Sequence, residues 1–131
     1  MFDKVIITVS NNISKHALLS VEERKELIRQ SVAEIPNVEV DSFDGLTVEY
    51  AKKVGATILL RGLRAVSDFE YEMQLSQTNR SLSEDIKTVF LITRPEYNFI
   101  SSSSVKEILK NDGDISKFVP KPVSDYLQNK K

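Results

Sequence analysis

The sequence predicts an α/β protein built on a mainly parallel β-sheet with helices on both faces. Short runs of β-branched and other apolar residues recur along the chain, as expected of strands buried on both sides. Segments with helical periodicity separate these runs, and strands that alternate with helices form βαβ units with parallel strands. The length of 131 residues suits a single domain, residues 1–131.

Four strands are expected, at residues 5–9, from residues 38–40 onward, at 57–60 and at 88–92. The first helix follows Ser20, because Ser20 and Glu23 have the spacing of a capping box. Pro36 ends this helix, whose apolar stripe consists of Leu27, Ile28, Val32 and Ile35.

Further helices are expected over residues 47–54, where Gly55 is the C-terminal cap, and from about residue 68 to 82. Ser103 is the predicted N-cap of the next helix, which Gly113 closes. A short last helix covers residues 123–127, and the polar tail at 128–131 is expected to fray.

The composition excludes several classes of function. Hydrophobic residues make up 40% and charged residues 28%, which is typical of a globular protein. The net charge of −1 provides no broad basic surface for nucleic acid or acidic lipid. Without cysteine the chain has no disulfide, thiolate nucleophile or cysteine zinc site. The early apolar run at 5–9 is too short for a signal peptide or membrane span, so a soluble cytoplasmic protein is expected.

Two polar segments follow predicted strands, where parallel sheets bind their ligands. The first comprises Arg61, Gly62, Leu63 and Arg64; its guanidinium groups and backbone amides suit a phosphate. The second comprises Ser101, Ser102, Ser103 and Ser104, leading into a helix with Lys106 in its first turn, which suits an anion. The alternatives are surface arginines paired with Asp68, Glu70 or Glu72, and a serine loop that only caps a helix.

Two further candidate residues, Lys15 and His16, follow the first strand. Lys15 could reach the same rim, although a single lysine is usually only solvated. His16, the only histidine, has no histidine or cysteine partner for a metal site, and is expected to be an exposed loop residue and not a catalyst.

Two blocks of this sequence resemble the phosphopantetheine adenylyltransferase family, at residues 61–72 (RGLRAVSDFEYE) and 100–107 (ISSSSVKE). The flanking pieces LSVEER at 19–24 and FVP at 118–120 are also similar, so the resemblance covers essentially the whole chain. It implies a Rossmann-like fold of the nucleotidyltransferase type and transfer of an adenylyl group from ATP to 4′-phosphopantetheine. The products would be dephospho-coenzyme A and pyrophosphate.

One departure from the family pattern concerns the start of the chain. The family begins with a strand, a Gly-Thr/Ser-Phe-Asp-Pro loop and a Gly-His pair, and nothing similar precedes Met1, Phe2 and Asp3. We expect the first β-α unit, with the histidine, to be lacking from this sequence, because the sequence is a truncated form of that of a normal enzyme. The truncation would come from an internal methionine taken as the start or from another loss of the leading segment. The alternative is a real shortened homologue with altered function.

The resemblance also implies roles for individual residues. Lys15 and Arg61 would hold the phosphopantetheine phosphate, and Thr47 and Asn79 would contact the pantetheine arm. ATP would be bound by residues of both polar segments and by Glu72: Gly62, Leu63, Arg64, Glu72, Tyr97, Asn98, Phe99, Ile100, Ser101, Ser102 and Ser103. Lys15, Arg64 and Ser102 would stabilise the charge of the transition state.

Mg²⁺ is implied as the companion of ATP, without a dedicated protein cage, and a homo-hexamer is implied as the assembly. Neither nucleic acid nor membrane is an expected partner. Three rival functions stay open: a nucleotide-binding homologue without turnover, a related nucleotidyltransferase with another acceptor, and a structural fragment whose arginines only form salt bridges.

Overall fold

The computed structural model describes residues 1–11 and 18–130. They fall into two compact units, one formed by Met1–Asp44 with Ser102–Lys131 and the other by Gly45–Ser101. Each unit contains one parallel pair of strands and its own helices.

The parallel strands confirm the predicted α/β class. In the first unit, β1 (Val5–Ser10) pairs with β2 (Val38–Phe43), with Val5 opposite Val38. In the second unit, β3 (Ile58–Leu63) pairs with β4 (Lys87–Ile92), with Ile58 opposite Lys87. Each pair is parallel because a helix connects its strands: α1 (Val21–Ser31) lies between β1 and β2 in the chain, and α3 (Val66–Leu82) between β3 and β4.

Helix α1 begins as predicted but ends earlier. The Glu23 amide donates to Ser20 Oγ at 3.1 Å, and the Ser20 amide donates to Glu23 Oε1 at 3.0 Å, which completes the capping box. Val32 leaves helical geometry with φ −110° and ψ 14°. Ile35 therefore lies beyond the helix and is 48% exposed, so its predicted place on the apolar stripe is wrong.

The first unit has its core around α4 (Ser102–Lys110) and α5 (Lys121–Asn129). The buried side chains are Val105, Leu109, Ile115 and Leu127, with Leu19, Ile108, Phe118, Val119 and Val123 packed around them. Two expectations are corrected. Helix α4 already starts at Ser102, so Ser103 is not the N-cap. The tail is not frayed up to residue 130, because α5 continues through Asn129 and Lys130 Nζ lies 3.0 Å from Glu23 Oε2.

The end of α4 is also formed differently from the prediction that Gly113 closes it. Asp112 takes the left-handed conformation with φ 58°. Its amide bonds to the Leu109 carbonyl at 3.1 Å, and the Gly113 amide bonds to the Ile108 carbonyl at 2.8 Å, the pattern of a Schellman motif. Gly113 is needed for space instead, since a Cβ there would lie 2.5 Å from Ile108 Cγ2.

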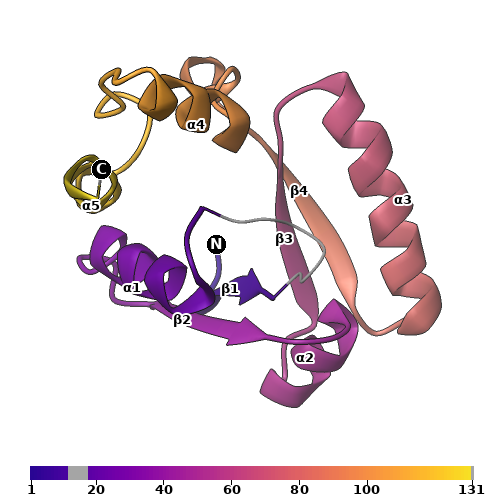
Figure 1. Ribbon diagram of the computed structural model, residues 1–131. Coiled ribbons are helices and arrows are strands. Elements are labelled where there is room, and N and C mark those ends of the chain that lie inside the picture. The colour runs from indigo at the N-terminus through magenta and orange to yellow at the C-terminus, as the bar shows by residue number, and fades with distance from the viewer. Residues whose placement is uncertain (12–17, 131) are drawn as a thin grey trace. The chain divides into compact units, whose positions relative to one another are not determined.

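In the second unit, α2 (Thr47–Val54) ends as predicted at Gly55, whose φ is 75°. The core of this unit comprises Val48, Ala51 and Ile86, with Ala56 and Leu59 packed against it. Helix α3 lies alongside β3 and β4, as Figure 1 shows. This arrangement brings side chains of β3 and α3 together at the carboxyl end of β3.

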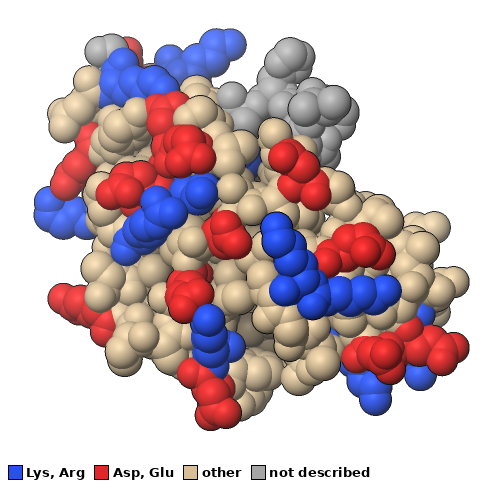
Figure 2. Space-filling model, turned by 90° about the horizontal axis from the view of Figure 1, so that it is seen from below, with Lys and Arg blue, Asp and Glu red and all other residues tan. Residues whose placement is uncertain are grey.

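On the face seen in Figure 2, basic and acidic side chains are interspersed and not separated by sign. An anion bound here would therefore need a local group of donors. Within residues 1–11 and 18–130, no helix has the length and apolar character required to cross a membrane.

Candidate functional site

The first polar segment belongs mostly to strand β3. Arg61, Gly62 and Leu63 lie opposite residues 90–92 of β4, and only Arg64 lies beyond the strand. The prediction that the strand stops at residue 60 is wrong because an arginine and a glycine do not interrupt the ladder when the neighbouring strand is paired through Ile92.

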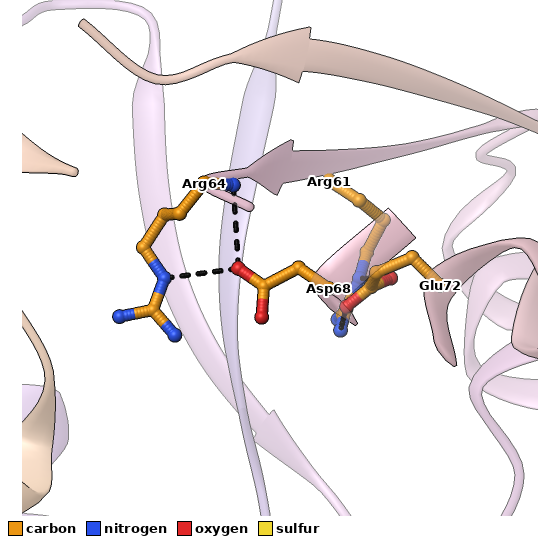
Figure 3. A network of polar contacts seen from close by, with 4 residues as sticks. All are labelled: Arg61, Arg64, Asp68 and Glu72. Carbon is orange, nitrogen blue, oxygen red and sulfur yellow. Dashed lines mark hydrogen bonds and ion pairs between the residues drawn. The ribbon is translucent and has the colours of Figure 1, made fainter. Parts of the chain in front are cut away.

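Arg61 is held by a carboxylate of α3. Alternation along β3 places Arg61 on the same face as Leu59, which packs on the core that α2 helps to form. Arg61 Nε donates to Glu72 Oε2 at 2.8 Å, and Nη2 donates to Oε1 at 2.6 Å, a bidentate pair visible in Figure 3. Glu72 is buried, with 8% exposure, and its hydrogen bonds raise the pKa of the Arg61 guanidinium.

Arg64 is fixed by two partners. Its amide and its Nε both donate to Asp68 Oδ2, at 3.2 and 3.1 Å. Its Nη1 donates to the backbone carbonyl of Ile100. Arg64 thus connects the end of β3 with the residues that lead to the serine run.

Both guanidinium groups keep hydrogen-bond donors that these contacts do not use. An arginine carries five N–H donors, and the described contacts of Arg61 and of Arg64 each occupy two groups on the guanidinium. The Arg61 and Arg64 side chains are 46% and 40% exposed, so solvent or a ligand reaches them. Fixed, partly exposed guanidinium groups at a strand's carboxyl end can bind phosphate oxygens.

Most other predicted site residues belong to the same unit. Thr47 is the first residue of α2, and Asn79 lies in α3. Leu63 is buried with 6% exposure, so a ligand would meet its backbone and not its side chain. Tyr97 ends a short 3-10 helix, Pro95–Tyr97, and Phe99 is 65% exposed. Asn98 caps this short helix and is followed by Phe99, Ile100 and Ser101.

The remaining predicted residues fall elsewhere. Ser102 and Ser103 are the first two residues of α4 and belong to the other unit. Lys15 and His16 lie outside the described residues. The structure thus forms two groups of polar contacts at the end of β3, Arg61 with Glu72 and Arg64 with Asp68 and the Ile100 carbonyl, and together they are the candidate site.

Two contributors to the candidate site were given no functional role from the sequence. From the sequence, Asp68 is only one of three acids that could pair with surface arginines, and the structure pairs it with Arg64, which lies just before α3. The Ile100 carbonyl has no signal in the sequence, because every residue carries the same backbone acceptor.

A metal ion finds no ready ligand set here. Over the described ranges, no three or more histidine, cysteine, aspartate or glutamate side chains gather in a way that could hold an ion. The two acids of the candidate site, Glu72 and Asp68, are already bonded to arginines, which makes them poor Mg²⁺ ligands.

Comparison with known proteins agrees with the parallel strands and flanking helices. Residues 1–108 match the model of a family described as Cytidylyltransferase-like. A phosphopantetheine adenylyltransferase from Lachnoclostridium phytofermentans is 53% identical over 130 residues, covering 99% of this chain and 80% of the relative. A second, from Caldanaerobacter subterraneus subsp. tengcongensis, is 51% identical and covers 99% of this chain and 81% of the relative. The chain therefore belongs to the cytidylyltransferase-like family and, within it, to the phosphopantetheine adenylyltransferases.

Proposed function

We propose that this protein transfers the adenylyl group of ATP to 4′-phosphopantetheine and forms dephospho-coenzyme A and pyrophosphate, a step of coenzyme A biosynthesis. The observation that carries the proposal is the pair of fixed guanidinium groups of Arg61 and Arg64 at the carboxyl end of β3. The relatives that are about half identical over nearly the whole chain carry the name of this activity.

The reaction requires no nucleophile from the protein. An oxygen of the acceptor phosphate attacks the α-phosphorus of ATP, a new P–O bond forms, and the bond to the β-phosphate breaks as pyrophosphate leaves. Catalysis then consists of holding two polyanions in line and stabilising the charge on the transferred group. Arginine, lysine and serine side chains suit this task, and a catalytic triad is not needed.

We assign to each site residue the role that the family resemblance implies for it. Arg61 and Lys15 bind the phosphate of the acceptor, and Thr47 and Asn79 contact its pantetheine arm. Arg64 and Ser102 bind ATP and, with Lys15, stabilise the transition state. The remaining ATP contacts are Gly62, Leu63, Glu72, Tyr97, Asn98, Phe99, Ile100, Ser101 and Ser103. Mg²⁺ would enter as the companion of the ATP phosphates, not as an ion resident on the described residues.

A cytoplasmic homo-oligomer, with a hexamer as the expected size, is the proposed state of the protein. Helix α3 supports an interface between copies because Phe69 and Met73, four residues apart and so on one side of the helix, are 45% and 41% exposed. Sedimentation of the wild type as a hexamer would support this assembly. A monomer at micromolar concentration would refute it.

The activity is tested by incubating the chain with ATP, Mg²⁺ and 4′-phosphopantetheine and measuring pyrophosphate and dephospho-coenzyme A. Product that appears only with this acceptor supports the proposal. Intact ATP binding without pyrophosphate would favour the rival non-catalytic homologue. Absence of ATP binding would favour the third rival, a structural fragment whose arginines only form salt bridges.

A further inference from the structure

Asp68 accepts two hydrogen bonds from one residue that precedes its own helix. It is the third residue of α3, and its Oδ2 lies 3.2 Å from the amide nitrogen of Arg64 and 3.1 Å from Arg64 Nε. The Asp68 side chain is only 29% exposed. A single carboxylate oxygen thereby fixes both the backbone at the end of β3 and the direction of the guanidinium.

The bond to Arg64 Nε determines which donors remain. Because Nε points to Asp68 and Nη1 donates to the Ile100 carbonyl, the Nη2 group has no described partner and is left for a ligand. The same geometry keeps the residues before Ser101 attached to the end of β3. Without Asp68, the long Arg64 side chain would sample several rotamers, and binding a ligand would then cost the entropy of ordering it.

We propose that Asp68 is a positioning residue for nucleotide binding: it orients Arg64, so that the guanidinium presents Nη2 to a phosphate while it holds the Ile100 carbonyl. This inference rests on the proposed function, since it assigns the ligand of Arg64 as the phosphate chain of ATP. Asp68 itself touches no substrate and acts through Arg64.

A purely structural role for Asp68 is the competing explanation. An acidic residue in the first turn of a helix interacts favourably with the helix dipole, whatever lies next to it. That role requires only the charge, whereas both bonds that Asp68 makes reach back to Arg64. The N-cap Ala65 has no side-chain cap of its own, so Asp68 also satisfies the amide of the residue before the cap.

A double-mutant cycle separates the two roles. The variants are Asp68→Ala, Asp68→Asn, Arg64→Ala and Arg64→Ala/Asp68→Ala in the full chain, with Glu70→Gln as the control that removes an acid close by on α3. ATP affinity is measured by calorimetry and turnover by pyrophosphate release. The ¹⁵N-bound proton of Arg64 Nε is followed by NMR, because it reports the bond to Asp68 without any ligand.

We expect Asp68→Ala to weaken ATP binding about tenfold, the effect of losing one hydrogen bond to a charged group. Asp68→Asn should have a smaller effect in the same direction. In the Arg64→Ala background the loss of Asp68 should change ATP affinity less than twofold, as expected for two residues that act as a unit. Glu70→Gln should match the wild type, and the Arg64 Nε signal should shift or broaden only in the Asp68 variants.

Three results would overturn the inference. They are independent effects of Asp68 and Arg64 on ATP affinity, an equal loss of affinity in Glu70→Gln, and an unchanged Nε signal in Asp68→Ala. In each case a wild type that binds ATP and releases pyrophosphate leaves the proposed function standing. A wild type that neither binds ATP nor turns over would refute the proposed function and, with it, the role of Asp68.

Discussion

The buried carboxylate of Glu72 holds the guanidinium of Arg61 through two parallel hydrogen bonds of 2.8 and 2.6 Å, eleven residues apart in the chain. The pair joins β3 to α3 at the end of the strand where ligands of parallel sheets bind. Glu72 therefore supports the local fold as well as the direction of Arg61.

Replacing Glu72 by glutamine tests this support. The variant keeps the shape of the side chain but removes the charge, and its amide nitrogen faces one of the Arg61 donors. We expect the free energy of unfolding to fall by about 1–2 kcal/mol, at the lower end for a bond to a charged group because Arg61 is half exposed. Urea denaturation measures the change. Glu96→Gln is the control, since the Arg94–Glu96 pair is exposed and 3.7 Å long, and should cost less than about 0.5 kcal/mol. Equal losses in both variants would contradict the supporting role of Glu72.

Two helix caps that depend on residues close together in the sequence were predicted correctly. The capping box of Ser20 and Glu23 depends on residues three apart, and the left-handed Gly55 follows from the end of one helix. The extension of β3 through Leu63 depends instead on the partner strand, so Arg61 and Gly62 looked like a loop. In the same way, the pairing of Lys130 with Glu23 joins residues more than one hundred positions apart, and the tail alone gave no sign of it.

The sequence predicted which arginines belong to the candidate site, but it did not predict which residue each arginine contacts. The sequence indicated that Arg61 and Arg64 would bind an anion and gave Asp68, Glu70 and Glu72 as possible partners, and the family resemblance also implied an ATP contact for Glu72. Which acid serves which arginine depends on how α3 lies against β3. The Ile100 carbonyl could not be predicted, because a backbone acceptor leaves no trace in the residue type.

Acid should loosen the contact between α5 and α1. Hydrogen bonds from Tyr126, the Ser20 amide and Lys130 lower the pKa of Glu23 from its usual 4.5 to about 2. A carboxyl with a lowered pKa in the folded state contributes stability above pH 4.5, and that contribution is lost as the pH falls toward 2. Thermal midpoints of the wild type and Glu23→Gln should therefore converge between these two pH values. Glu22→Gln, one residue away and exposed, should follow the wild type throughout. A constant gap between wild type and Glu23→Gln would refute the assignment.

The turn after α4 offers a stabilising change. Asp112 adopts φ 58°, a conformation that glycine reaches without steric cost. We expect Asp112→Gly to raise the free energy of unfolding by about 0.5–1 kcal/mol. Gly113→Ala should have the opposite effect, because the added Cβ would lie 2.5 Å from Ile108 Cγ2. This overpacking should lower the free energy of unfolding by about 1–3 kcal/mol. Chemical denaturation measures both. A less stable Asp112→Gly variant together with a more stable Gly113→Ala variant would contradict both the cost of the Asp112 conformation and the lack of space at Gly113.

Asn79 should separate binding of the acceptor from binding of ATP. It lies in α3 of the same unit as Arg61 and Arg64, and its backbone carbonyl already accepts the Ser83 amide at 2.9 Å, so substitution of the side chain leaves that bond in place. If the side-chain amide contacts the pantetheine arm, Asn79→Ala loses one neutral hydrogen bond, and the KM for 4′-phosphopantetheine should rise about three- to tenfold. The KM for ATP should not change, because the pantetheine arm lies on the acceptor. Thr78→Ala is the control on the neighbouring position, where the hydroxyl donates to the Gln74 carbonyl within the helix. A rise in both KM values, or the same rise in Thr78→Ala, would place Asn79 outside the acceptor site.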